Sequence, residues 1–403
     1  MSRYYQAPGS GLIYYNLALL AWFTLLLSFC LEFGLNYCLA SGRIQASKLT
    51  GLALIWTFAA GIIAFFVLKF SLRKIITDTT GINFLYISVI YIIGNLLIGF
   101  FSSLLFSLKN FVTSNLVLAF GNCILIILIP KRTLVSLAQD HFIYIYFISF
   151  LIQGFILFII FLIKNVAGLK IRLPDLADLK LLLELSLWGF FSNALSMLLY
   201  RIDYYFVNRY CTPLSLGNYI QASKMVQIFL VLPAIISTTL FPITAGGELK
   251  NPVINIQFLS RSLLFFSIIP AAILMLTGKW LFPYLFGNSF QFMYKPFNLL
   301  VPGVLAFCVI CPITSYYGGK KILYVNLIAL LISVSFVTVS YPAVVPAYGI
   351  LAAAIVSSLG YISYAAILLW FFSRHHVVSL SNFFTFHLED FRWIKNLTGK
   401  TKA

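Results

Sequence analysis

Long apolar stretches follow one another along this chain and take up most of its length. A membrane span takes about 20 apolar residues, and hydropathy windows of that size mark eleven stretches, at residues 12–39, 49–68, 84–108, 114–129, 142–163, 185–207, 219–241, 262–276, 297–317, 322–339 and 348–372. The connections between them are short and leave no room for an inserted soluble domain. The pattern predicts an all-α polytopic membrane protein with about eleven transmembrane helices.

Composition excludes a water-soluble fold and does not favour nucleic-acid binding. Of the 403 residues, 61% are hydrophobic and only 9% are charged, and the mean hydropathy is +0.99. A soluble domain has about 25% charged residues. The formal net charge is +17, but the lysines and arginines are scattered over the connections and form no basic patch interleaved with aromatic residues. No nucleic-acid partner is therefore expected.

The distribution of positive charge predicts an orientation in the membrane. The chain has 27 lysines and arginines. When the connections are assigned alternately to the two sides of the membrane, sixteen of them lie on one side and ten on the other, and Arg201 lies within a span. Cytoplasmic connections carry an excess of lysine and arginine. The first set is therefore predicted to be cytoplasmic, with the C-terminus inside and Met1 outside.

The most charged connection divides the stretches into five and six. Residues 164–184 contain three acidic and four basic residues, and we expect an N-terminal lobe at residues 1–170 and a C-terminal lobe at 171–375. Residues 376–403 follow as a cytoplasmic tail. Apolar residues at helical spacing in this tail predict an amphipathic helix on the membrane surface, and a free solvated tail is the alternative.

Two stretches begin alike, which suggests an internal repeat. Residues 8–14 (Pro-Gly-Ser-Gly-Leu-Ile-Tyr) and 213–219 (Pro-Leu-Ser-Leu-Gly-Asn-Tyr) each place a turn signal with glycine before a tyrosine and a long apolar span. Transporter folds often contain repeats, although chance could supply this one. The seventh stretch, which begins at residue 219, is the second helix of the C-terminal lobe. If the repeat is real, the first stretch of the chain corresponds to it and takes the position of a second helix. The N-terminal lobe would then lack the helix that opens the C-terminal lobe.

Several short motifs occur in an order that resembles one family of membrane proteins. They are Glu32-Phe-Gly34-Leu35-Asn36, Arg201-Ile-Asp203, Gly217-Asn-Tyr219 to Lys224, Leu240-Phe241-Pro242, Leu285-Phe-Gly287 to Phe290, and Pro346-Ala-Tyr-Gly349 to Ala354. Their order and spacing extend over nearly the whole chain. In them the chain resembles the polysaccharide-biosynthesis membrane proteins, which are the O-antigen (O-unit) flippases of the multidrug/oligosaccharidyl-lipid/polysaccharide exporter superfamily.

The resemblance implies a fold and a function. The family has twelve helices in two lobes around a central cavity, and this chain matches helices two to twelve, so the first is expected to be absent. The implied role is to move an undecaprenyl-pyrophosphate-linked oligosaccharide across the bacterial inner membrane by alternating access. The implied partners are that lipid-linked oligosaccharide, membrane lipids and other glycan-assembly membrane proteins. A shortened chain that no longer functions is an alternative that the sequence leaves open.

Four charged residues are the candidate site residues. Arg201 lies about 9 Å inside the outer end of its predicted helix, Lys224 lies about as deep on the next helix, and both could bind the pyrophosphate. Asp203 is about 200° around the helix from Arg201, so each needs a partner on another helix or in a wet cavity. Asp203, and less favourably Glu32, could bind a coupling proton or sodium ion. The alternatives are that Arg201 and Lys224 extend to the outer headgroups and that Glu32 is a capping or interfacial residue.

Other functional classes are less consistent with the sequence. An integral-membrane enzyme that modifies glycans needs acid/base or metal-binding groups on an external connection, and the external acids Asp78 and Asp140 lie on different short connections. No cofactor or metal is expected, since the neighbouring His375 and His376 face different directions. A drug or metabolite antiporter of the same superfamily would share the fold and differ in substrate, although membrane-embedded acids are scarce here.

Overall fold

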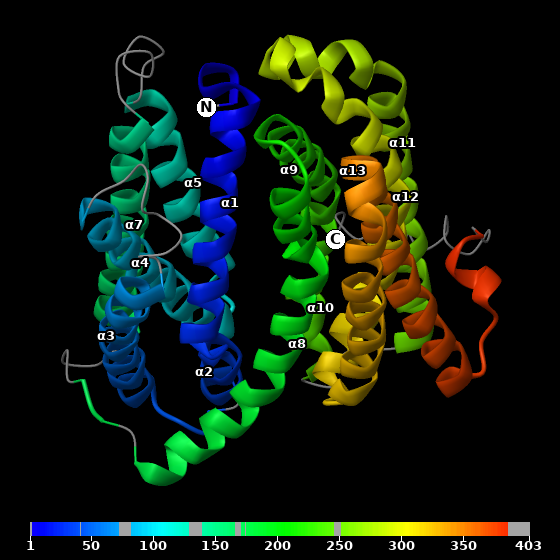
Figure 1. Ribbon diagram of the computed structural model, residues 1–403. Helices are drawn as coiled ribbons and strands as arrows, with labels where there is room; N and C mark the ends of the chain where they lie inside the picture. The colour runs from blue at the N-terminus through cyan, green and yellow to red at the C-terminus, as the bar shows by residue number, and fades with distance from the viewer. Residues whose placement is uncertain are drawn as a thin grey trace, which may run out of the picture. The chain divides into compact units, whose positions relative to one another are not determined.

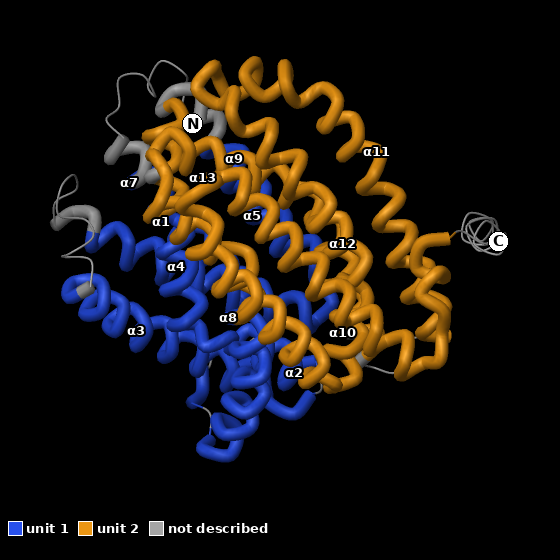
Figure 2. The backbone as a smooth tube through the Cα atoms, turned by 45° about the vertical axis from the view of Figure 1, so that its right-hand side comes forward, with its two compact units in different colours: residues 1, 16–194 blue, residues 2–15, 195–403 orange. Residues whose placement is uncertain are grey.

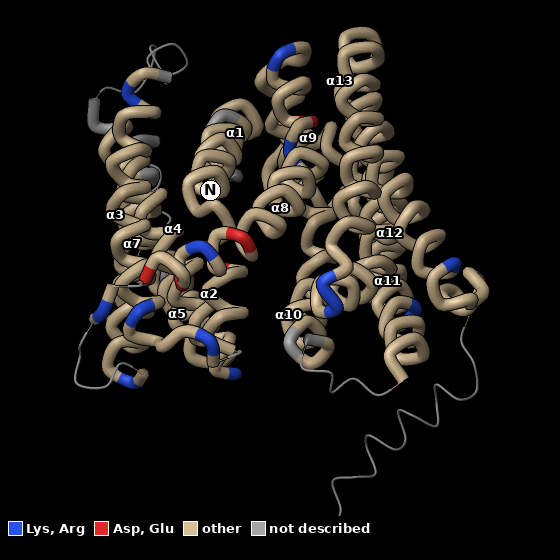
Figure 3. Tube along the Cα trace, turned by 90° about the horizontal axis from the view of Figure 1, so that it is seen from below, with Lys and Arg blue, Asp and Glu red and all other residues tan. Residues whose placement is uncertain are grey.

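The fold is described by a computed structural model that covers residues 2–40, 42–71, 82–128, 139–165, 171–173, 175–245 and 251–385 (Figure 1). All regular structure within these ranges is helical. The prediction of an all-α protein is therefore confirmed. Charged residues are sparse over the described helices (Figure 3).

The number of spans agrees with the prediction. Nine helices in the described ranges are long and apolar enough to cross a membrane, and α5 (Phe111–Leu128) is a shorter apolar helix. The last helix, α13 (Leu323–His376), has 54 residues and a backbone break at Gly349, where φ is 60°. A single helix of that length would span about 80 Å, against a hydrocarbon core of about 30 Å. Counting α5 as a span and α13 as two gives the eleven predicted spans.

The first predicted span, 12–39, is not one continuous helix, and the prediction was wrong there. The chain forms α1 (Ser2–Ser28) and α2 (Leu31–Ala40), and Phe29 and Cys30 between them have φ values of 49° and 50°. The indole Nε1 of Trp56 donates to the Leu27 carbonyl oxygen at 2.8 Å. That hydrogen bond satisfies one carbonyl that the break removes from the helix.

A second interruption divides the seventh span. It consists of α9 (Pro213–Gln227), a 3-10 turn at Ile228–Leu230 and α10 (Val231–Ala245). Pro233 has no N–H to donate to the Phe229 carbonyl one turn earlier. The Cys308 thiol donates to that carbonyl instead, at 3.6 Å.

The chain divides into two compact units, coloured separately in Figure 2. Unit 1 contains residues 1 and 16–194, and unit 2 contains residues 2–15 and 195–403. The chain passes from one unit to the other within α1, after the kink at Gln6, and within α8 (Leu176–Tyr210). The lobe boundary expected between residues 170 and 171 lies in the charged connection. The boundary between the two compact units lies further along the chain, between residues 194 and 195 of α8.

Unit 1 is organised around α4 (Ile82–Ser107). This helix packs against α2, α3 (Ala46–Ser71), α5 and α7 (Gln139–Asn165). A methyl group added at Gly94 of α4 would lie 2.5 Å from the Leu151 nitrogen of α7. Only glycine permits this approach of two helix backbones.

Unit 2 repeats this order of packing around α12 (Tyr294–Gly319). This helix packs against α10, α11 (Pro252–Phe286) and α13, as α4 packs against α2, α3 and α7. Gly303 of α12 again lies against the last helix, where its N–H donates to the Ser358 hydroxyl at 2.9 Å. The two central helices are equally buried: in each of them, 61% of an apolar segment of 18 residues lies inside the protein.

The predicted C-terminal tail begins as a packed segment. A 3-10 turn at Leu380–Phe383 follows α13, and the Phe383 ring is buried 5.6 Å from the Phe372 ring. Arg261 of α11 donates to the Asn382 carbonyl at 2.8 Å. Residues 386–403, which carry most of the predicted amphipathic helix, lie outside the described ranges.

Candidate binding site

Asp203 is a fully buried carboxylate on α8. Its Oδ2 accepts hydrogen bonds from the Tyr219 hydroxyl of α9 at 2.6 Å and from the Ser357 hydroxyl of α13 at 3.3 Å. Its Oδ1 accepts from the Tyr204 N–H at 2.8 Å. A buried carboxylate is tolerated only when it is hydrogen-bonded in this way. Two of its three partners lie on other helices, which is one of the two environments that the sequence left open for it.

The hydrogen-bonded group around Asp203 extends across both parts of α13. The Ser357 Oγ is 2.8 Å from the Tyr341 hydroxyl, 2.9 Å from the Tyr219 hydroxyl and 2.9 Å from the Ala353 carbonyl oxygen. All of these side chains are buried. Sequence reasoning did not find Ser357 or Tyr341. The available signal was the run of small residues at 352–354 and 357–358, which permits close approach of helices in membranes.

Arg201 belongs to a second hydrogen-bonded group, which shares Tyr204 with the first. One guanidinium nitrogen donates to the Tyr204 hydroxyl, and the other donates to the Gln227 Oε1 at 3.1 Å. The Ser223 hydroxyl accepts from both Tyr204 and Gln227, at 3.0 Å each. Tyr204 contacts both residues, through its N–H to Asp203 and its hydroxyl to Arg201, whereas their other partners differ.

The direction of the Arg201 side chain bears on the headgroup alternative. Arg201 lies about 14 Å along α8 from Tyr210, where the chain turns back into α9. Its partner Gln227 lies about 21 Å along α9 from Pro213 at the same turn. The guanidinium group is held at this depth by hydrogen-bond partners on α8 and α9.

Lys224 lies beside the first helix. Its Nζ is 2.8 Å from the centroid of the Tyr14 ring of α1, in a cation–π arrangement. The backbones of α1 and α9 are close there, since a methyl group added at Gly217 would lie 1.9 Å from the Ala7 carbonyl oxygen. Gly11 lies against Gly217 in the same contact. The two similar segments, 8–14 and 213–219, thus pack against each other within unit 2.

Within the part of the chain that the structure describes, neither cation forms an ion pair with a carboxylate. The ion pairs among the described residues join Lys48 to Asp175 at 2.5 Å and to Asp178 at 2.9 Å, in unit 1. Arg201 and Lys224 are half-buried in unit 2. Two half-buried cations without carboxylate partners can bind an anion through charge-assisted hydrogen bonds.

Glu32 belongs to unit 1, in contrast to the other three candidates. It lies in the first turn of α2, directly after the break at Phe29 and Cys30. Its carbonyl oxygen accepts from the Ser103 hydroxyl at 2.5 Å. A methyl group at Gly99 of α4 would lie 3.1 Å from its carboxylate Oε1. The structure therefore places Glu32 on a broken helix and packs its side chain against the central helix of unit 1.

Comparison with known proteins relates this fold to transporters. No protein-family model matches the sequence, and no curated protein matches it either. The chain is similar to the crystal structure of the Vibrio cholerae MATE transporter VcmN in the bent form, with a TM-score of 0.67 and 14% identity over 94% of this chain and 90% of that one.

Two further solved structures have the same arrangement. One is the lipid II flippase MurJ in an inward closed conformation, with a TM-score of 0.68 and 17% identity over 93% of this chain and 83% of that one. The other is the inward-facing conformation of a multidrug resistance MATE family transporter of the MOP superfamily, with a TM-score of 0.63 and 16% identity over 94% and 96% of the two chains. This chain is therefore a multi-pass membrane protein with the fold shared by MATE transporters and the MurJ lipid II flippase.

Proposed function

We propose that this protein is a flippase that moves an undecaprenyl-pyrophosphate-linked oligosaccharide across the bacterial inner membrane by alternating access. The observation that carries the proposal is the pair of half-buried cations, Arg201 and Lys224, that have no carboxylate partner among the described residues. Similarity in fold to a protein named as a lipid II flippase supports it. The resemblance of the sequence motifs to O-unit flippases supplies the substrate class.

The proposed substrate fits the chemistry of these residues. A pyrophosphate needs cations that neutralise it away from bulk water, and hydrogen bonds from arginine and lysine to phosphate oxygens are about twice as strong as neutral ones. Arg201 is held by Tyr204 and Gln227, so its guanidinium is positioned before the substrate binds. The Lys224 ammonium lies on the Tyr14 ring and has three donors to offer. In this proposal the polyprenyl tail remains in lipid.

Asp203 is the proposed site for a coupling proton or sodium ion, and Glu32 is the second candidate. The Asp203 carboxylate accepts from side chains of α9 and α13, so a change in its charge alters the contacts of three helices. A ligand can shift a conformational equilibrium only through such differences in contacts between states. Ion binding at Asp203 would thereby favour one packing of α8, α9 and α13 over another.

A drug or metabolite antiporter is the second candidate function. Similarity to MATE transporters favours it, and the buried Asp203 could then bind a cationic drug or its counter-ion. This alternative predicts drug resistance that requires Asp203 and that is the same in cells with and without the glycan pathway.

Complementation distinguishes the two functions. The chain is expressed in a bacterium that lacks its lipid-linked glycan flippase but retains the matching glycan pathway, and surface polysaccharide is measured. We expect restoration by the unmodified chain and loss with Arg201→Ala combined with Lys224→Ala. Arg209→Ala combined with Lys279→Ala is the matched control, because both of these side chains are exposed.

Two results would contradict the proposal. Full surface polysaccharide from the Arg201/Lys224 double variant would remove the pyrophosphate site. Drug export by the unmodified chain without any surface polysaccharide would favour the antiporter.

A further inference from the structure

Tyr204 of α8 connects the two hydrogen-bonded groups of unit 2. Its N–H donates to Asp203 Oδ1 at 2.8 Å, and its hydroxyl accepts from the Arg201 guanidinium and donates to Ser223. The central guanidinium carbon also lies 5.0 Å from the centroid of the Tyr204 ring. One residue therefore contacts both the carboxylate of the proposed ion site and a cation of the proposed anion site.

Tyr219 of α9 adds a second connection. Its hydroxyl donates to Asp203 Oδ2 at 2.6 Å, and its ring meets the Tyr204 ring edge-on, with centroids 6.1 Å apart. Both tyrosine side chains are buried. Packed aromatic rings therefore hold the carboxylate and the guanidinium at a set separation.

The charged and titratable groups around Asp203 come from three helices. They are Arg201 and Tyr204 of α8, Tyr219 of α9, and Tyr341 and Tyr361 of α13. Tyrosine hydroxyls are neutral at physiological pH, so the charged member of this set is Arg201. In the described part of unit 2, Asp203 is also the one acidic residue. A change in its charge therefore acts most directly on Arg201.

The two charges interact without forming an ion pair. Arg201 and Asp203 are about 200° apart around α8, and the ion pairs of the described residues lie in unit 1. Lys224 also interacts electrostatically with Arg201. At an effective dielectric constant of about 20, a unit charge roughly 12 Å from a bound anion changes its affinity about tenfold. The Asp203 carboxylate thus opposes anion binding at Arg201 and Lys224.

We propose that the charge on Asp203 sets the affinity of Arg201 and Lys224 for their anion, with Tyr204 as the positioning residue between them. A proton on Asp203 strengthens anion binding, and loss of the proton releases the anion. Each ligand favours the other by the same factor, as linkage requires. This rests on the function proposed above and adds the regulation of that site.

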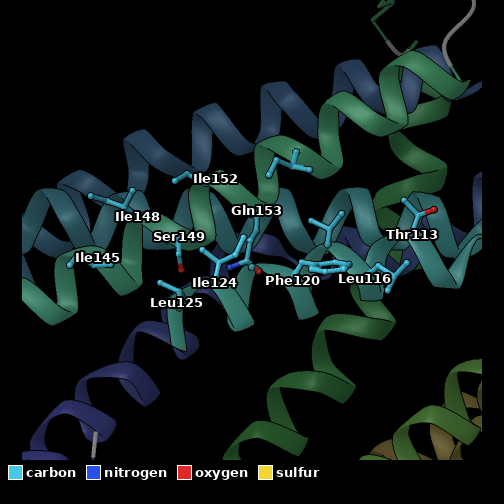
Figure 4. Close-up of a pocket in the computed structure, with 13 residues that line it drawn as sticks. Thr113, Leu116, Phe120, Ile124, Leu125, Ile145, Ile148, Ser149, Ile152 and Gln153 are labelled. Carbon is cyan, nitrogen blue, oxygen red and sulfur yellow. The ribbon is translucent and has the colours of Figure 1, made fainter. Parts of the chain in front are cut away.

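The apolar groove of unit 1 provides a comparison. It lies open between α5 and α7, has a volume of about 570 Å³ and is walled mainly by isoleucine and leucine (Figure 4). Its buried polar side chain is Gln153, which is 4% exposed and whose Nε2 has no hydrogen-bond partner among the described residues. In unit 2, α8 covers α13, the counterpart of α7, and the Phe206 ring stacks on the Tyr341 ring at 5.3 Å. Gln153 is therefore a buried polar residue outside the Asp203 group, suited to a control variant.

Anion binding to the purified full chain tests the proposal. The probe is farnesyl pyrophosphate, farnesol is the uncharged reference, and dissociation constants are measured by calorimetry in lipid nanodiscs at pH 8. Asp203→Asn should bind the probe about tenfold more tightly than the unmodified chain, because the amide carries no charge. Tyr204→Phe keeps the ring but loses the hydroxyl that contacts Arg201. In a double-mutant cycle it should reduce that gain to about threefold or less, whereas Gln153→Leu should leave the gain unchanged.

A second measurement needs no change at Asp203. The probe is a prenyl sulfonate, whose charge is the same at pH 8 and pH 5. The unmodified chain should bind it about tenfold more tightly at pH 5, where Asp203 takes up its proton. Lys224→Arg should keep this gain, because arginine is charged at both pH values, and Asp203→Asn should lose it. This comparison decides the proposal even if Asp203→Asn fails to fold.

Several outcomes would overturn the proposal and leave the pyrophosphate site in place. They are equal affinity in Asp203→Asn and the unmodified chain at pH 8, a pH effect that persists in Asp203→Asn, and a pH effect that disappears in Lys224→Arg. An undiminished gain in the Tyr204→Phe cycle would remove Tyr204 as the positioning residue. Farnesol bound as tightly as farnesyl pyrophosphate would instead contradict the proposed function itself, and its regulation with it.

Discussion

The two units pack their helices in the same order but bury different chemistry at equivalent places. In unit 2, residues next to the Gly303–Ser358 contact include Ser357, which hydrogen-bonds to the buried Asp203. In unit 1, the residue next to the equivalent Gly94–Leu151 contact is Phe150, whose ring packs against Tyr91 at 5.0 Å. Among the described residues, the hydrogen-bonded group of Asp203 and Ser357 therefore has no counterpart at the equivalent contact of unit 1. A repeated framework does not require a repeated site.

The units also differ in how their grooves are covered. In unit 2 the helix α8 brings Asp203 and Phe206 against α13. In unit 1 the groove between α5 and α7 stays open. The unit with the covering helix is the one with the polar group, because Asp203 and Arg201 are residues of α8. Two of the four candidate residues therefore lie on the covering helix, whereas Lys224 lies on α9 and Glu32 on α2.

The largest effect should come from the close contact between α1 and α9. Gly217→Ala would place a methyl group 1.9 Å from the Ala7 carbonyl oxygen, so two backbones must separate. We expect a loss of about 3 kcal/mol in stability, measured as thermal unfolding in detergent. Gly61→Ala in unit 1 is the control, because its methyl group meets only the flexible tip of Ile93. Equal losses would show that the α1–α9 contact is no tighter than an ordinary one.

A smaller loss should follow when the hydroxyl of Ser357 is removed. Ser357→Ala deprives Asp203, Tyr219 and Tyr341 of a shared partner, and a buried polar group left unpaired costs about 2 kcal/mol. Unfolding in detergent measures the change. Ser340→Ala is the matched variant, since its exposed hydroxyl bonds only to Phe336 of its own helix. If the two variants unfold alike, the Asp203 group does not depend on Ser357.

The third prediction compares the acids of the two units. Asp203→Asn should lower surface polysaccharide about tenfold in the complementation assay, which corresponds to about 1.4 kcal/mol, because the amide cannot bind a coupling cation. Glu32→Gln should have the smaller effect. The amount of each variant in the membrane is measured alongside. A larger loss with Glu32→Gln would move the ion site from unit 2 to unit 1.

The smallest effect concerns the break in the first span. Trp56→Phe removes the indole donor to the Leu27 carbonyl, and the net contribution of one such hydrogen bond is about 1 kcal/mol. Thermal unfolding should show this loss. Trp280→Phe, at an indole that is 71% exposed, should not. An unchanged midpoint for both would mean that another group satisfies Leu27.

Most of the membrane architecture could be predicted from hydropathy, but the helix breaks could not. Residues 12–39 read as one span because Phe29 and Cys30 are apolar and carry no glycine or proline signal. The break is stabilised by partners such as Trp56, and nothing in the sequence indicates that Trp56 lies beside Leu27. The break before Val231 has a local cause in Pro233, and that signal was available.

The candidate site could be predicted in part. Arg201, Asp203 and Lys224 were identifiable because charges are costly inside a span, and a costly residue indicates a special environment. Ser357 and Tyr341 were not, since hydroxyl side chains are common in membrane helices and lie far along the chain from Asp203. Gln153 was overlooked for a related reason, because an uncharged amide barely lowers the hydropathy of its span.

Hydropathy and charge by themselves decided that this protein crosses a membrane many times and which ionised residues lie within it. They act locally, through the free energy of transferring each segment from water to hydrocarbon. The partners of Asp203, the contact of α1 with α9 and the open groove beside Gln153 were decided by tertiary structure alone. They depend on which helices become neighbours, and that is settled by close packing of side chains distant in sequence.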